Sequence, residues 1–368
     1  MSPAPLSPSA SSTRLLSLDA LRGFDMCWIL GLATLVEQVL QRAFPEYHLA
    51  ASIAMQFDHV AWDGFRFYDL IFPLFLFLAG VSLAIAVPRR LARDGRVATI
   101  RHLLARAAIL VALGVIFSGG VKNGWDQIRW LGVLQRIGIA SAAAGFLSLF
   151  LKTRGLTVAA ATLLIGYFLL LLCVPVPGVG AGNFAEGMNL TNYLDSIWLP
   201  GRKYDGNHDP EGILSTLPAI ATALLGILAG KWLTSPASPW RKVAALIAAG
   251  LLMLALGWAW HPFFPVIKKI WSSSFVLVAA GWSAILLGLF YAIVDVLGWR
   301  RGLAPFLWVG ANPIALYLCS GFGFFRTISE RLATAPPPPY DWLPSAMTFA
   351  IMLATAQWLH KRQLFLKV

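Results

Sequence analysis

The chain has 368 residues, of which 58% are hydrophobic and only 12% are charged, and its mean hydropathy is +0.70. Ordinary soluble domains carry about 25% charged residues, so these values exclude a soluble globular protein. The net charge of +12 would suit a nucleic-acid partner. We predict no such partner, because the basic residues follow the pattern of membrane topology instead.

Apolar runs of roughly 20 residues recur along the chain, and a run of that length crosses a bilayer as a helix. The pattern predicts an all-α polytopic membrane protein with about ten transmembrane helices. The predicted spans are residues 21–41, 67–87, 103–121, 131–151, 156–175, 213–232, 241–259, 273–294, 303–322 and 343–360. An even number of spans places both termini on one face. Most basic residues fall in segments on that face, which predicts that both termini are cytoplasmic.

The regions outside these spans are few. Residues 1–14 are rich in Ser and Pro and are predicted to be a disordered cytoplasmic N-terminus without a cleavable signal peptide. Residues 15–368 are predicted to form a single transmembrane domain. Two long outer loops, 42–66 and 176–212, mix aromatic and charged groups, which is typical of functional loops. The polyproline segment at 336–339 is predicted to be a spacer in another outer loop.

His59 lies in the first long outer loop, within His59-Val-Ala-Trp62-Asp63-Gly64, and Asp69 follows at the start of an apolar run. An imidazole exchanges a proton near neutral pH, so His59 is a candidate general base. It is equally a candidate to accept an acyl group itself. Asp58 or Asp63 would orient the ring. The alternatives are an interfacial histidine bonded to a loop carbonyl and, for Asp69, a helix N-terminal acid favoured by the dipole.

Gln135-Arg136 lies within the fourth predicted span, and Arg129 flanks it from the preceding loop. An arginine at that depth is costly without a partner. A phosphate or carboxylate of a bound ligand would serve, and so would an internal acid such as Asp25.

Two further polar motifs adjoin predicted spans. Asp209-Pro210-Glu211-Gly212 precedes the sixth span, and its carboxylates would hold sugar hydroxyls or an ammonium group, or else cap the helix. Asn312 sits in Gly310-Ala311-Asn312-Pro313 beside a predicted helix break, which often marks a binding site. Its alternative role is an interhelical hydrogen bond.

Several common motifs are missing from the sequence. It has no Walker loop, no HExxH, no GxSxG and no cysteine pair, so ATP-driven transport and zinc or serine hydrolysis are not supported. The three cysteines lie inside apolar runs, and no metal site is predicted.

Taken together, these segments resemble the transmembrane N-acetyltransferases related to lysosomal heparan-α-glucosaminide N-acetyltransferase. The similar motifs are Leu18-Asp19 with Arg22-Gly23, His59-x-x-Trp62-x-Gly64, Asp69-Leu70-x-Phe72-Pro73, Trp125-Asp126-x-x-Arg129, Gly132-Val133-Leu134-Gln135-Arg136, Val174-Pro175-Val176-Pro177-Gly178, Asp209-Pro210-Glu211-Gly212-Ile213-Leu214, Trp271-Ser272-x-Ser274 and Asn312. They cover nearly the whole chain in order. One departure is Asp63, which stands where the animal enzyme resembles Asn.

The resemblance implies a transmembrane acyltransferase domain that moves acetyl from cytosolic acetyl-CoA, a cosubstrate, to the amine of a glucosamine-type sugar beyond the membrane. It implies His59 as the active-site histidine, and we add Asp63 and Asp69 as its catalytic partners. We expect Gln135, Arg136 and Arg129 to contact acetyl-CoA. We expect Trp62, Asp209, Glu211 and Asn312 to contact the sugar.

The resemblance also suggests a multi-pass homodimer in a bacterial inner membrane, in contact with lipid. Heparan sulfate is a poor guess for the acceptor, and free or cell-wall amino sugars fit better. Two alternatives stay open from the residues alone: a sugar or sugar-acid permease, and an O-acyltransferase of a surface glycan. The direct and acetyl-histidine mechanisms also stay open. A membrane scaffold ranks low, because it has no need of polar residues inside spans.

Overall fold

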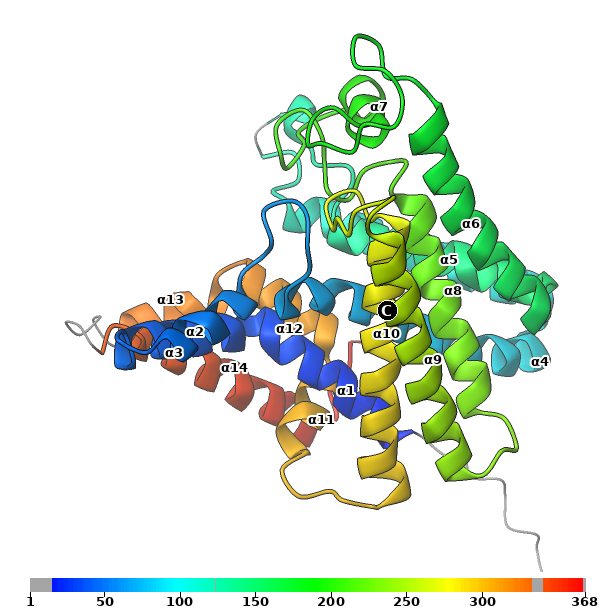
Figure 1. Ribbon diagram of the computed structural model, residues 1–368. Coiled ribbons are helices and arrows are strands. Elements are labelled where there is room, and N and C mark those ends of the chain that lie inside the picture. The colour runs from blue at the N-terminus through cyan, green and yellow to red at the C-terminus, as the bar shows by residue number, and fades with distance from the viewer. Residues whose placement is uncertain (1–14, 123, 333–339, 367–368) are drawn as a thin grey trace, which may run out of the picture.

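The computed structural model describes residues 15–122, 124–332 and 340–366, which form helices, loops and a few isolated β-bridges (Figure 1). The all-α prediction is confirmed for these residues. The predicted N-terminal segment 1–14 and the polyproline segment 336–339 lie outside them.

The helices follow one another with short connections in the first and last thirds and long loops in the middle. The longer ones are α1 (Leu16–Cys27), α2 (Ala33–Ala43), α4 (Phe67–Phe117), α5 (Val133–Phe150), α6 (Thr153–Cys173), α8 (Thr216–Leu233), α9 (Pro239–Trp260), α10 (Ser273–Phe290) and α14 (Leu343–Lys361). The shorter ones are α3 (His48–Ala54), α7 (Leu190–Trp198), α11 (Ala304–Ala311), α12 (Pro313–Gly321) and α13 (Phe324–Leu332). The π-helical turns η1 (Trp28–Leu32) and η4 (Tyr291–Val296) continue α1 and α10, and the 3-10 turns η2 (Met55–Phe57) and η3 (Trp125–Gln127) lie in loops.

Within the described residues, seven helical stretches are long and apolar enough to cross a membrane. They are Leu16–Ala43, Phe67–Phe117, Val133–Phe150, Thr153–Cys173, Thr216–Leu233, Pro239–Trp260 and Ser273–Val296. Eight of the ten predicted spans overlap with them, because Phe67–Phe117 covers the second and most of the third. The multi-pass character is therefore supported, while the number of ten and the side of the termini stay predictions.

The connection between the second and third predicted spans differs from expectation. Residues 88–102 were expected to form a loop, but α4 runs through them as part of a 51-residue helix. Only Gly95 leaves the helical conformation, with φ 78°. The segment is rich in Arg, Leu and Ala, which favour helix even at a membrane surface. Gly95 therefore divides α4 into two helices, 67–94 and 96–117, joined without a loop.

Asn312 divides the ninth predicted span into α11 and α12, as the predicted helix break requires. The tenth predicted span corresponds to α14. Three short helices, α3, α7 and α13, lie in loops where no helix was predicted, because short helices without an apolar run give no strong sequence signal.

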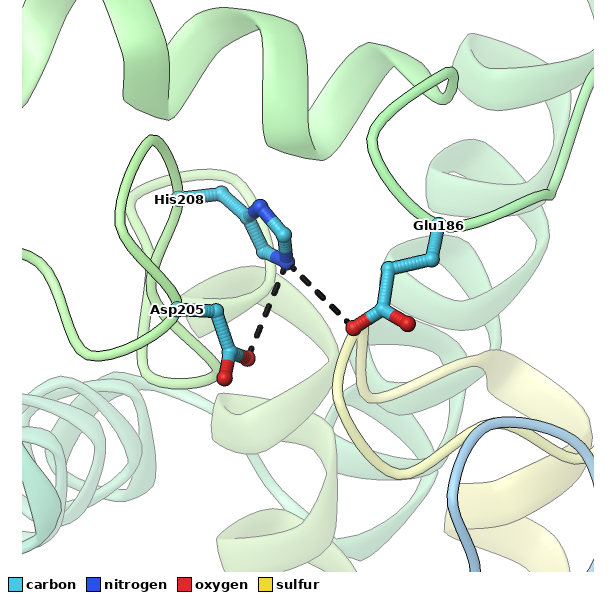
Figure 2. A group of neighbouring side chains, drawn as sticks. All are labelled: Glu186, Asp205 and His208. Carbon is cyan, nitrogen blue, oxygen red and sulfur yellow. Dashed lines mark ion pairs between the residues drawn. The ribbon is translucent and has the colours of Figure 1, made fainter.

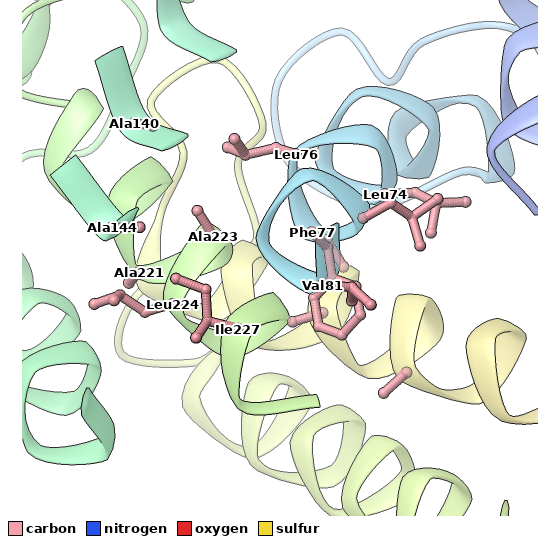
Figure 3. Packing of buried hydrophobic residues seen from close by; sticks show 14 of the residues in the cluster. Leu74, Leu76, Phe77, Val81, Ala140, Ala144, Ala221, Ala223, Leu224 and Ile227 are labelled. Atoms are coloured by element: carbon pink, nitrogen blue, oxygen red, sulfur yellow. The ribbon is translucent and has the colours of Figure 1, made fainter. Parts of the chain in front are cut away.

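The helix α4 lies at the centre of the main bundle and packs on α5 and α8, while α9 packs on α10 (Figure 1). Figure 3 shows the apolar side chains between these helices, including Leu74, Phe77 and Val81 of α4 and Ile227 of α8. A methyl group on Gly226 would collide with the carbonyl oxygen of Phe77. This glycine therefore permits the close backbone approach typical of membrane helix pairs.

Two smaller apolar clusters complete the core. One joins α1 to α11, α12, α13 and α14 and includes Met26, Val309 and Phe325. The other lies under the long loops and includes Tyr167 and Phe264, with Trp62 packed against it. This third cluster gives the loops around His59 a packed support.

Candidate active site

The loop that carries His59 is joined to the loop between α9 and α10. The backbone N–H of Gly64 donates to the carbonyl of Val266 at 2.9 Å, and Asp63 forms a β-bridge with Ile267. The Trp62 indole N–H donates to the carbonyl of Phe184 at 3.0 Å. Backbone and indole bonds thus fix three loops in one arrangement, and this fixes where His59 lies.

His59 forms a cluster with Asp69 and Lys268. Its Nδ1 lies 2.8 Å from Asp69 Oδ1 and 2.9 Å from Lys268 Nζ. Lys268 Nζ lies 3.2 Å from the same Asp69 oxygen. Asp69 is 1% exposed, whereas the His59 side chain is 51% exposed. A buried carboxylate that accepts from Nδ1–H leaves Nε2 as the basic nitrogen on an accessible ring.

Asp69 contacts both the start of α4 and the His59 ring. Its Oδ2 accepts from the backbone N–H of Arg66, the N-cap residue of α4, at 3.1 Å and from that of Val60 at 3.3 Å. Its Oδ1 faces His59 and Lys268. The start of α4 and the imidazole are therefore held by one side chain.

The other acids of this loop lie elsewhere. Asp63 Oδ1 is 3.7 Å from His261 Nδ1, and the Asp58 side chain accepts from the backbone N–H of His59 at 2.8 Å. The predicted ring-orienting contact from Asp58 or Asp63 is made by Asp69 instead. The reason is that helix α4 projects its third residue toward the loop that precedes it.

Lys268 was not among the predicted site residues. Burial lowers its pKa, and the opposing carboxylates of Asp69 and Glu211 do not fully offset that effect. Its contact with His59 could not be predicted from local sequence, since Lys268 lies in a short loop far from His59 in the chain.

A second cluster joins the loop before α5 to the loop before α8. Arg129 Nε and Nη2 donate to the two Asp209 oxygens at 2.8 and 2.7 Å, and Nη2 also reaches Glu211 Oε2 at 2.6 Å. The guanidinium lies 5.0 Å from the Tyr204 ring centre. Two motifs that were predicted to contact different substrates thus form one ion network.

The electrostatics of this network follow from burial and charge. Burial raises the pKa of Asp209, but the Arg129 guanidinium outweighs that effect and lowers it overall. Glu211 behaves oppositely, because burial raises its pKa by more than Arg136 and Arg129 lower it. Two neighbouring carboxylates therefore differ in affinity for a proton, a property common at acid–base sites.

Arg136 lies deeper, fully buried near the start of α5. Its Nη2 donates to the Gly212 carbonyl at 3.2 Å and to Ser215, and its guanidinium lies 5.0 Å from the Trp271 ring centre. Its Nε and Nη1 have no hydrogen-bond partner among the described residues. The two carboxylate oxygens of Asp25 likewise lack a hydrogen-bond partner there, and no described ion pair joins Asp25 to Arg136.

The neighbouring Gln135 donates to the Arg129 carbonyl at 3.2 Å, which links the two arginines through the backbone. Trp271 connects this region to the His59 cluster, because its backbone N–H donates to the Lys268 carbonyl at 2.9 Å. Trp271 has φ 52°, a conformation that costs a non-glycine residue energy and that clusters at functional sites.

A cavity of about 470 Å³ lies at the C-terminal end of the first half of α4, opposite the end that carries Asp69. Five arginines and a histidine are among its described lining residues, and no acid is: Arg22, Arg89, Arg90, Arg93, Arg106 and His102. Beyond Phe75, Pro313 and Ile314 lies a smaller, apolar pocket that shares these three residues and reaches Phe72 and Leu134. Phe72 contacts Trp271 at a ring distance of 4.9 Å, so the apolar pocket approaches the Arg136 region.

Asn312 lies beside this cavity, between its lining residues Ala311 and Pro313. Its Nδ2 donates to the Leu364 carbonyl at 2.8 Å, and its Oδ1 accepts from the Leu366 N–H at 2.9 Å. The side chain therefore attaches the C-terminal segment to the helix break. This matches the hydrogen-bonding alternative, although the partner is a chain segment and not a second helix.

Asp195 is a further buried acid that sequence reasoning missed. Its carboxylate accepts from the backbone N–H of Ile213 at 2.9 Å and of Asp209 at 3.4 Å. Burial raises its pKa to about 6, against the lowering effect of those N–H groups. Asp195 thus holds the backbone on which Asp209 and Glu211 are placed. The Asn-rich start of α7 was its only sequence signal.

Comparison with known proteins identifies the family. Residues 14–255 match the family model of the heparan-alpha-glucosaminide N-acetyltransferase catalytic region. The chain belongs to this family. It is 26% identical to the Mus musculus heparan-alpha-glucosaminide N-acetyltransferase over 85% of the chain and 56% of that protein. It is 28% identical to the Homo sapiens protein of the same name over 71% of the chain and 48% of that protein. The chain therefore spans about half the length of these relatives, and the predicted family resemblance is confirmed.

Proposed function

We propose that this protein transfers the acetyl group of acetyl-CoA to the amine of a glucosamine-type sugar. The observation that carries the proposal is the cluster of His59, Asp69 and Lys268, with an accessible imidazole held by a buried carboxylate. The names of the relatives support the same reaction. No other described cluster combines an exposed base with a fixed acid of this kind.

In the proposed reaction His59 Nε2 takes a proton from the sugar ammonium or from the attacking amine. The base is needed because a protonated amine has no lone pair with which to attack. The amine nitrogen forms a bond to the thioester carbon, and the carbon–sulfur bond breaks to release the CoA thiolate. Asp69 accepts the Nδ1–H bond and stabilises the imidazolium. Lys268, 3.3 Å from Nε2, is placed to stabilise negative charge on the thioester oxygen.

The donor would enter through the basic cavity. Its phosphates match the arginine-rich lining, and its pantetheine arm matches the apolar pocket that leads past Phe72. The two unpartnered nitrogen atoms of Arg136 and the Gln135–Arg129 pair would steady the thioester end. The arginine-rich cavity would face the cytoplasm, and His59 would face the periplasm of a bacterial inner membrane. We expect a homodimer, as the resemblance suggests.

The acceptor would be positioned by Glu211 and Asp209, which Arg129 holds in a fixed arrangement before the sugar binds. Asn312 and Asp63 are assigned no contact with the sugar or with the His59 ring. Asn312 bonds to the C-terminal segment, and Asp63 faces His261. Trp62 serves through its bond to Phe184 as a support of the loop.

The decisive experiment follows labelled acetyl transfer from acetyl-CoA to glucosamine, galactosamine, muramic acid and chitosan fragments, with purified protein in detergent. His59→Ala should reduce turnover by at least about 100-fold, the usual contribution of a general base. His48→Ala, which changes an exposed histidine of α3, is the matched control and should leave turnover unchanged.

Near-normal turnover in His59→Ala would overturn the assignment of the base. If no amine accepts acetyl, uptake of the same sugars into liposomes would test the permease alternative. Labelled protein formed from acetyl-CoA alone, and absent in His59→Ala, would favour an acetyl-histidine intermediate over direct transfer.

A further inference from the structure

Glu186, Asp205 and His208 bring three potential metal ligands together in the long loop between α6 and α8. One ligand atom from each lies within 4.8 Å of the others. His208 Nε2 is 3.8 Å from Glu186 Oε1 and 3.7 Å from Asp205 Oδ2 (Figure 2). Two ligands of a tetrahedral zinc ion lie about 3.4 Å apart, so a small closure of these side chains would form three corners.

His208 is buried and has one ring nitrogen available to bind a metal ion. Its side chain is 5% exposed, and its Nε2 has no hydrogen-bond partner among the described residues. Figure 2 shows this nitrogen directed between the two carboxylates. Its Nδ1 lies 2.7 Å from Asn207 Oδ1, an amide oxygen that can only accept a hydrogen bond and so favours the tautomer with the hydrogen on Nδ1. The lone pair of Nε2 therefore points into the cluster.

A cation already sits beside these carboxylates. Lys269 Nζ lies 2.6 Å from Glu186 Oε1 and 3.3 Å from Asp205 Oδ2, the same two oxygen atoms that face His208. With a neutral imidazole, two carboxylates and one ammonium leave a net charge of −1. A divalent ion in place of the ammonium would neutralise the cluster.

We propose that Glu186, Asp205 and His208 form a zinc site whose ion exchanges with the Lys269 ammonium. One imidazole nitrogen and two carboxylate oxygens, with water as a fourth ligand, suit zinc. Calcium and magnesium prefer more ligands and oxygen alone. The Asp205-x-x-His208 spacing was too short a signal to reveal the site from sequence, because Glu186 comes from a different part of the loop.

The position of this zinc site connects it to both functional clusters. His208 immediately precedes Asp209, which holds Arg129, and Lys269 immediately follows Lys268, which contacts His59. A bound ion would join two segments of the long loop and release the Lys269 side chain from them.

The test uses the untagged full chain in detergent, titrated with zinc in competition with a chromophoric zinc chelator, and it needs no acetyl transfer. Wild type should bind one zinc ion at this site. His208→Ala should weaken binding by at least about tenfold, and so should Glu186→Gln, which changes an exposed side chain and is suited to keep the fold. His48→Ala is the matched control and should bind as wild type does.

Lys269→Met should bind zinc about tenfold more tightly, because the competing ammonium is gone. A gain of affinity at an unchanged stoichiometry and an unchanged thermal unfolding midpoint distinguishes this effect from zinc binding by misfolded chain. Equal binding by wild type, His208→Ala and Glu186→Gln would overturn the site. Unchanged affinity in Lys269→Met would overturn the exchange with lysine.

Discussion

The two ends of the first half of α4 differ in how their charges are arranged. At the Asp69 end, acids and bases are paired: His59 and Lys268 with Asp69, and Arg129 with Asp209 and Glu211. At the other end, arginines and His102 line the basic cavity, and the acids that pair with some of them, Asp19 and Asp94, lie outside its described lining. Paired groups suit a site that must be rigid for chemistry. A surplus of one sign suits attraction of a ligand with the opposite charge.

The largest test of the paired end is Arg129→Ala. It would leave the fully buried Asp209 carboxylate without its partner, and breaking a buried pair costs about 3–5 kcal/mol. We expect a large drop in the thermal unfolding midpoint in detergent. Arg326→Ala is the matched control, since its pair with Glu330 is exposed, and it should change the midpoint little. Equal effects of the two substitutions would contradict the stabilising role of the buried ion pair.

Asp69→Asn tests the same end through chemistry. The amide keeps the size of the side chain and one oxygen for the N–H of Arg66, but it removes the negative charge that faces His59 and Lys268. We expect turnover to fall by about 100-fold. Asp63→Asn serves as the control, because Asp63 does not contact the ring, and it should retain most activity. Turnover is measured by labelled acetyl transfer, and a wild-type rate in Asp69→Asn would contradict the arrangement.

Arg89→Glu tests the end with the basic cavity. It reverses one charge in the cavity lining, so the KM for acetyl-CoA should rise about tenfold while kcat stays near wild type. The effect should shrink as salt screens the charge. Arg301→Glu, outside the cavity lining, controls for the change in net charge. A fall in kcat with constant KM would show that this end takes part in chemistry.

A further test concerns the pH dependence of stability at Asp195. Its pKa is about 6 in the folded protein, against about 3.9 for an unperturbed carboxyl. Its contribution to stability is therefore complete below about pH 4 and is lost as the pH rises through 6. Asp195→Asn carries no such charge, so between pH 4 and 7 its stability should rise relative to wild type by about 3 kcal/mol, at about 1.4 kcal/mol for each pKa unit. Unfolding midpoints across this range measure it, and a difference independent of pH would contradict the raised pKa.

The fold was predictable from sequence mainly where a long apolar run or a local motif determines the structure. The spans at α5, α6, α8, α9 and α10 were predicted to within a few residues, since twenty apolar residues in succession have one stable solution in a bilayer. The break at Asn312 followed from the proline after it. The helical structure of 88–102 on either side of Gly95 was missed, because a basic segment is compatible with both a loop and a surface helix.

The site could be predicted only in part, for a related reason. The candidates His59, Asp69, Arg129 and Asp209 lie in local motifs, and the structure brings them into two adjacent clusters. Their actual partners depend on which loops meet. Lys268 and Asp195 act from distant segments, so their contribution appears only when the chain is folded.

The uninterrupted first half of α4 gives the molecule a fixed length. Asp69 and Arg90 are separated by 21 residues, which is about 30 Å along a helix. That is the thickness of the hydrocarbon core of a typical bilayer. In a bilayer of that thickness, a helix of this length has one charged group near each surface of the hydrocarbon core. A thinner or thicker membrane would force it to tilt or would deform the surrounding lipid. The separation of these two charged groups is thereby equal to the thickness of a typical hydrocarbon core.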